Sequence, residues 1–120
     1  MDEVKIQVES MDAFFESAVD MARKLDEGDF STQPASLSFA SMEQFLRVMT
    51  SNRWSLLRAL RQSGPSSIRA LSHQLERDYR GVHADVAALL KTGLIEKLAD
   101  GKIRVPWKKI TAEMDMGLAA

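Results

Sequence analysis

The spacing of helix start and stop signals between residues 50 and 93 constrains the fold more than any other feature of this sequence. Three segments with helical apolar spacing follow one another there, and each opens with Ser, Thr, Asn or Asp, the residues that cap helix N-termini. Gly64-Pro65 separates the first segment from the second, and Gly93 ends the third. The pattern predicts three consecutive short helices. Their expected starts lie at 50–52, at Ser66 or Ser67, and at Asp78.

A β-hairpin is expected directly after the third helix. Residues 94–98 and 102–105 have the residue pattern of two strands, and the turn between them contains Asp100-Gly101. Asp-Gly between two such segments is among the stronger short-range hairpin signals. The order helix, helix, helix, hairpin over residues 51–105 is typical of a winged helix-turn-helix. The predicted fold class is therefore α+β, with a winged helix-turn-helix at its centre.

Both ends of the chain add elements outside this pattern. Alternating residues predict strands at 5–9, 37–39 and 110–116, and an amphipathic helix is expected at 11–27, between Ser10 as N-cap and Gly28. Short isolated strands are marginal in water, so the three are expected to form one sheet, within a chain or across a dimer. Helix 11–27 is expected to cover the apolar side of that sheet.

One more short helix is predicted from Ser41 and Gln44, which form a capping-box pattern in front of Met42, Phe45, Leu46 and Met49. The expected organisation has three parts. They are a strand–helix–strand extension at 1–40 for dimerisation or partner binding, a winged helix-turn-helix domain at 41–109, and a C-terminal strand at 110–120.

Composition excludes several functional classes. The sequence has no cysteine, which rules out disulfides, thiolate zinc sites and a cysteine nucleophile. His73 and His83 are too few to build a structural zinc site, and no phosphate-binding loop or nucleophile motif is present. No apolar run approaches the ~20 residues that span a bilayer, and residues 1–10 lack the regions of a secretory signal. We expect a cytoplasmic, non-enzymatic protein with no cofactor, no metal and no membrane contact.

The net charge of −1 hides a strong polarity along the chain. Residues 1–49 contain ten acidic and four basic side chains, whereas residues 50–110 contain five acidic and twelve basic ones. Such asymmetry indicates nucleic-acid or membrane contact on the basic side, or simply two solvated faces of opposite sign.

Helix 78–92 is the expected reading helix, because the second helix of a helix-turn-helix lies in the major groove. On a helical wheel, Arg80, Ala84, Ala87 and Lys91 point away from the core face, with His83 beside them. An Arg in the first turn suits bidentate contact with guanine, although Arg80 could also be an ordinary surface residue. Phosphate contacts are expected from Ser66, Ser67, Arg69, Arg77 and, on the wing hairpin 94–105, Lys97, Lys102 and Arg104.

Two ring side chains on this helix have both structural and functional interpretations. Tyr79 fits the edge of the core, and its hydroxyl could instead contact the DNA backbone. His83 could hydrogen-bond Asp85, the start of the helix or a phosphate.

The stretch from Arg53 to Val105 resembles small prokaryotic winged-helix transcriptional regulators broadly like the MarR and ArsR groups. The nearest likeness is to a subgroup whose reading helix begins Asp-Tyr-x-x-Val-His and ends Leu-x-x-x-Gly-Leu-Ile. Here these residues are Asp78, Tyr79, Val82, His83, Leu89 or Leu90, Gly93, Leu94 and Ile95. The resemblance covers slightly under half of the chain and implies binding of double-stranded DNA and, usually, a homodimer. Gly81 and Ala84 depart from it, since an amide or cationic residue and a charged residue are commoner there.

The main alternative is a protein-interaction module, because a winged helix can serve purely for docking. The acidic helix 11–27 would then hold a protein partner. An antitoxin-like protein would combine both roles, binding DNA with one part and a toxin with the other.

Overall fold

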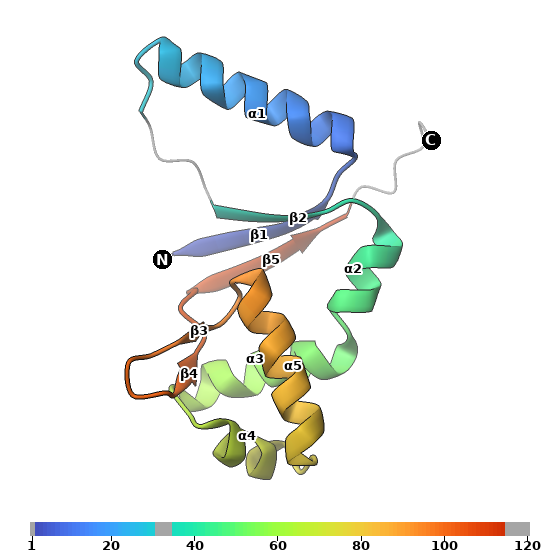
Figure 1. Ribbon diagram of the computed structural model, residues 1–120, viewed down its shortest axis with the longest axis vertical. Helices are drawn as coiled ribbons and strands as arrows, with labels where there is room; N and C mark the ends of the chain where they lie inside the picture. Colours follow the sequence, from blue (N-terminus) through green and yellow to red (C-terminus); the bar gives the residue numbers. More distant parts are fainter. Residues whose placement is uncertain (1, 31–34, 115–120) are drawn as a thin grey trace. The chain divides into compact units, whose positions relative to one another are not determined.

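The computed structural model describes residues 2–30 and 35–114, in which the chain forms an α+β protein with five helices and five strands (Figure 1). In chain order these are β1 (Glu3–Val8), α1 (Met11–Asp26), β2 (Ala35–Phe39), α2 (Met42–Val48), α3 (Ser51–Ser63), α4 (Ile68–Leu75), α5 (Tyr79–Thr92), β3 (Glu96–Lys97), β4 (Ile103–Arg104) and β5 (Lys109–Glu113).

The described residues divide into two compact units. We call residues 47–108 together with Asp2 the helical unit. The sheet unit comprises the described residues of 3–46 and 109–114.

The sheet unit joins three strands that lie far apart in the sequence. β1 is the central strand of a parallel sheet ordered β2-β1-β5, and Ile6 pairs with Leu37 on one side and with Ala112 on the other. The expectation that the three terminal segments form one sheet is confirmed within a single chain. The strand expected at 110–116 runs from Lys109 to Glu113, and residues 115 and 116 lie outside the described part.

The two faces of this sheet differ sharply in polarity. Residues paired in register share a face, so the side chains of Val4, Ile6 and Phe39 lie on one apolar face, and all three are buried. The opposite face is polar and internally bonded. There Gln7 Nε2 donates to Ser38 Oγ at 3.2 Å, and Lys5 Nζ pairs with Glu113 at 2.8 Å.

Helix α1 forms as the sequence indicates but does not cover the sheet. Ser10 caps it by accepting a hydrogen bond from Ala13 N at 3.1 Å, and Gly28 follows it with a φ of +83°. None of its sixteen residues is buried, so α1 is not what covers the buried face of the sheet (Figure 1). The prediction that helix 11–27 covers the apolar side is wrong. The physical reason is that Val4, Ile6 and Phe39 are already buried without it, and the other face of the sheet is polar.

The capping signals of the central region are confirmed. Thr50, Ser67 and Asp78 accept hydrogen bonds from the backbone N–H three residues ahead, at the starts of α3, α4 and α5. Ser41 Oγ likewise accepts from Gln44 N at 3.1 Å, while Gln44 Oε1 accepts from Ala40 N at 2.9 Å.

The helical unit has an aliphatic core drawn from α3, α4, α5 and the hairpin. Its buried side chains include Leu56, Leu57, Leu60, Leu71, Val82, Val86, Leu89, Leu94, Ile95 and Ile103. Trp54 of α3 is only half-buried.

The hairpin is shorter than predicted. Glu96 pairs with Arg104, and Gly101 has a φ of +88° in the turn. The strands do not reach back to Leu94 because Leu94 and Ile95 are consecutive and both buried, which breaks strand alternation.

Candidate nucleic-acid interface

The outward side of α5 carries cations and small residues and no acid. Arg80, His83, Ala84, Ala87 and Lys91 are all exposed, as the helical wheel predicts. The only acidic side chain of α5 is Asp85, which is buried on the opposite side. Within the described residues, neither Arg80 nor Lys91 forms an ion pair, so both charges are available to a partner.

Three side chains connect α4 to the first turns of α5. The guanidinium carbon of Arg69 lies 4.9 Å from the centre of the Tyr79 ring, and that ring lies 5.8 Å from the ring of His83. Tyr79 is 43% exposed, so it is not one of the buried core residues. The planar guanidinium of Arg69 stacks on the Tyr79 ring. Its N–H donors lie at the edge of the guanidinium plane, so the ring does not block them.

Asp85 fixes α5 from the inside. Its carboxylate accepts from Arg53 Nε at 3.0 Å and from Arg77 Nη2 at 2.8 Å, while Arg53 Nη1 also donates to the carbonyl of Val48 at 2.7 Å. The carboxylate therefore ties α5 to α3 and to the turn between α4 and α5. In the part of the chain that it describes, the structure shows no hydrogen bond between His83 and Asp85. The two residues are two positions apart and therefore lie on different sides of the helix.

The sequence analysis missed this role of Asp85, although a signal was present. Asp85 lies three residues after Val82 and four before Leu89, in the middle of the apolar face of α5. A lone acid in a core face needs a buried cation, which Arg53 and Arg77 supply.

Arg77 was expected to contact phosphate, and the structure corrects this expectation. Its side chain is 25% exposed and its charge is paired with Asp85. Its Nη1 atom is buried and has no hydrogen-bond partner within the described residues. Because the guanidinium is committed to Asp85 in the interior, Arg77 positions the turn between α4 and α5 and is poorly placed for the expected phosphate contact.

The start of α4 also differs from expectation. Ser66 and Ser67 were expected to contact phosphate, which free backbone N–H groups at the start of a helix can do. Ser66 N instead donates to the carbonyl of Ile103 at 3.0 Å, and Ile103 N donates back at 2.9 Å. Ser67 Oγ is occupied as the cap of α4. The Ser66 N–H is therefore unavailable, because it extends the hairpin by one bridge.

The hairpin offers two unpaired cations and one paired cation. Lys97 and Lys102 are exposed and form no ion pair within the described part of the chain. Arg104 is bonded through Nε and Nη2 to the same oxygen of Glu96, at 2.6 Å each. An exposed pair of this kind is weak, so Arg104 can exchange Glu96 for a phosphate at little cost.

Gly81 has a local explanation. A Cβ atom at this position would lie 3.0 Å from Asp78 Oδ1 and 3.4 Å from Arg77 Nη2. Asp78 caps the helix by accepting from Gly81 N at 2.8 Å, and its carboxylate together with the Arg77 guanidinium would crowd a side chain here. A larger residue at position 81 would require these two side chains to shift.

Other functional classes receive no support from the described residues. No three His, Asp or Glu side chains among them come together as metal ligands. None of the helices that the structure describes is long and apolar enough to cross a membrane.

A protein-family model, HVO_A0114, matches residues 48–112, which is just over half of the chain and includes α3, α4, α5 and the hairpin. The comparisons with curated proteins and with solved structures gave no match.

Proposed function

The chain belongs to the HVO_A0114 family, and from its helical unit we propose that it is a DNA-binding transcriptional regulator with a winged helix-turn-helix fold. In this proposal α4 and α5 form the helix-turn-helix, α5 enters the major groove, and the hairpin of β3 and β4 is the wing. The observation that carries the proposal is the outward face of α5, which presents Arg80, His83 and Lys91 with no acid among them.

Charge placement supports an interaction with a polyanion. The one acid of α5 is withdrawn into the interior by two arginines, so its negative charge does not oppose the outer cations. Cations that have no internal partner gain most from neutralising phosphates, because binding then releases counterions without breaking ion pairs.

The shape of α5 supports groove binding. Ala84 and Ala87 separate the cations on its outer face, and small side chains let a helix approach base edges closely. The major groove is about 12 Å wide and admits one α-helix. Arg80 in the first turn would contact a guanine, and Lys91 at the far end would contact the backbone.

The other site residues would contact the phosphate backbone. Arg69, Tyr79 and His83 would contact the phosphates beside the groove, where Arg69 is already held by the Tyr79 ring. Lys97 and Lys102 would contact phosphates from the wing, with Arg104 joining them after leaving Glu96. The protein would bind as a homodimer on a two-fold site.

A second candidate function is protein docking, antitoxin-like if the partner is a toxin. It is favoured by the apolar side chains that α1 leaves exposed, such as Phe15 and Val19.

The proposal is tested by selecting DNA from a random pool with the full chain at a stated salt concentration. We expect a two-fold sequence to emerge and its affinity to fall steeply as salt is raised. A chain that binds no duplex even at low salt refutes the proposal and leaves protein docking as the function.

A further inference from the structure

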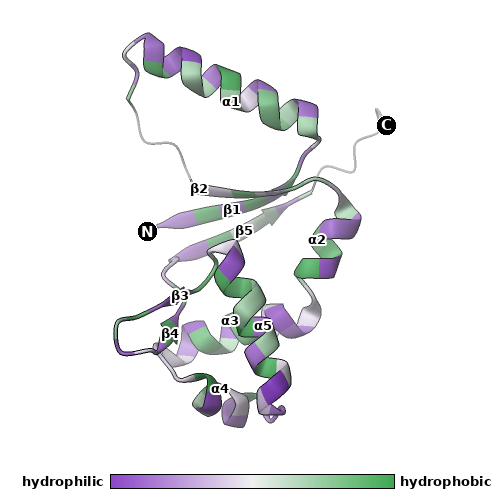
Figure 2. Ribbon diagram, viewed as in Figure 1, coloured by the Kyte–Doolittle hydropathy of each residue, from purple (hydrophilic) through white to green (hydrophobic). Residues whose placement is uncertain are grey.

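The largest apolar surface without a partner in the sheet unit is one side of α1. Its large side chains are each between 46% and 62% exposed: Met11, Phe14, Phe15, Val19, Met21 and Leu25. Ala18 and Ala22 lie among them, and the apolar positions recur along the helix (Figure 2). Together these side chains expose on the order of 600 Å², at the upper end for the largest patch on a monomer.

The sheet of the same unit offers this side of α1 no matching surface. The polar face of the sheet carries Lys5, Gln7 and Ser38, which are bonded to one another or to carboxylates. Burying apolar side chains against such groups would gain little and would remove water from the ion pair of Lys5.

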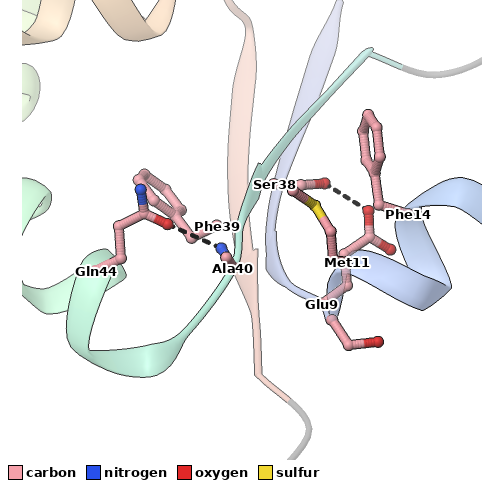
Figure 3. Close-up of a pocket in the computed structure, with 8 residues that line it drawn as sticks. Glu9, Met11, Phe14, Ser38, Phe39, Ala40 and Gln44 are labelled. Atoms are coloured by element: carbon pink, nitrogen blue, oxygen red, sulfur yellow. Dashed lines mark hydrogen bonds between the residues drawn. The ribbon is translucent and has the colours of Figure 1, made fainter.

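An open groove lies at the start of α1. Met11 and Phe14 line an open cavity of about 270 Å³ whose other walls include Ser38 and Gln44 (Figure 3). Phe39 and Ala40 make its lining mostly apolar, and Ser38 Oγ donates to Glu9, another lining residue, at 2.8 Å. The apolar side of α1 therefore begins at an open, mostly apolar groove, and Met11 and Phe14 stay 62% and 48% exposed there.

We propose that two copies of the chain pair through α1, with the two helices antiparallel about a two-fold axis near Ala18 and Val19. This pairing does not depend on DNA binding. A second copy supplies a matching apolar strip, and covering both strips would bury about 1,200 Å², the lower limit of a standard specific interface.

The charges of α1 select the antiparallel arrangement. Its first half carries Asp12 and Glu16 and no cation, whereas its second half carries Arg23 and Lys24 and is neutral overall. A parallel pair would place the two acidic halves side by side. An antiparallel pair places each acidic half beside the partner's basic residues, with Asp12 within about 3 Å of Arg23 along the axis. The existing pair of Arg23 with Asp20, at 3.7 Å on the exposed surface, costs little to exchange.

A pair of matched substitutions tests the surface. Ala18→Glu places two carboxylates at the two-fold axis, whereas Ala13→Glu adds the same side chain on the other side of the same helix. We expect the natural chain to sediment as a dimer at micromolar concentration, Ala13→Glu to match it, and Ala18→Glu to dissociate about 100-fold more readily. Circular dichroism should show equal helix content in all three, because no α1 residue is buried.

The absence of cysteine allows a direct test of the orientation. A short bis-maleimide should link Ala18→Cys to its own copy, but not Leu25→Cys, whose copies lie about 20 Å apart along the axis of an antiparallel pair. A mixture of Met11→Cys and Leu25→Cys should link to each other. A monomeric natural chain, a dimer unaffected by Ala18→Glu, or efficient self-linking of Leu25→Cys would each overturn the proposal.

Discussion

Replacing Asp85 tests how α5 is held in place. Asp85→Ala removes the acceptor of two charge-assisted hydrogen bonds and leaves Arg53 and Arg77 without a counter-charge. Breaking a fully buried ion pair in this way costs about 3–5 kcal/mol. The two arginine side chains keep 20% and 25% exposure, so water relieves part of the penalty. We therefore expect a loss of about 3 kcal/mol in unfolding free energy, the low end of the range.

Tryptophan fluorescence is the appropriate assay, because both tryptophans, Trp54 and Trp107, lie in the helical unit. Urea unfolding followed by this signal measures the stability of that unit. A loss of about 3 kcal/mol in a unit of this size lowers the melting temperature by at least about 12 °C.

A double-mutant cycle with Arg77→Met separates the ion pair from general damage. Arg77→Met alone should cost less than Asp85→Ala, since Arg53 still neutralises the carboxylate and the buried unpaired Nη1 atom disappears. The double variant should cost about 1 kcal/mol less than the sum of the singles. Additive losses, or a loss for Asp85→Ala below about 1 kcal/mol, would refute the assignment of Asp85 as the anchor of α5.

Three further outcomes are expected. Arg80→Ala should weaken binding to a selected duplex by about 1–3 kcal/mol while leaving a scrambled duplex nearly unchanged; equal losses on both would make Arg80 a phosphate contact. Lys102→Ala should weaken both duplexes alike and lower the salt slope by about one, whereas Arg58→Ala, which removes an exposed cation of α3, should change neither. Ser67→Ala should cost about 1 kcal/mol in urea unfolding, because Ala70 N loses the cap of α4; an unchanged midpoint would contradict this.

Local signals predicted the elements of this chain well, because each depends on a few neighbouring residues. Ser10, Thr50 and Asp78 begin helices where their capping side chains allow, and Gly93 ends α5 with a φ of +81°. The pairing of the terminal strands was also predicted, since no short strand is stable alone. The length of the hairpin was not, because consecutive burial of Leu94 and Ile95 depends on the tertiary core.

The candidate site was predicted unevenly for a related reason. Periodicity alone indicates which side of α5 faces outward, so the exposure of Arg80 and Lys91 followed from the sequence. Periodicity cannot show which charged groups neutralise each other across the fold. Arg77 and Arg69 look alike in sequence, yet Arg77 pairs with a carboxylate eight residues ahead and Arg69 stacks on Tyr79. The prediction that α1 covers the sheet failed for a similar reason. The amphipathicity of α1 indicates that its apolar side needs a partner surface, but it does not identify that surface.

The two proposals are linked by how little α5 has available to read DNA. Gly81 has no side chain, and on the outer face of α5 Ala84 and Ala87 have no hydrogen-bonding groups. Arg80 is therefore the main candidate for direct readout, which is worth about 1–3 kcal/mol for one bidentate contact. A regulator needs about 4–10 kcal/mol of preference over non-specific DNA. A single copy falls short of this range, whereas two copies held at a fixed spacing add their contacts and also select the distance between half-sites. If α1 holds the dimer, Ala18→Glu should therefore reduce sequence preference much more than affinity for scrambled DNA, while Arg80 itself stays intact.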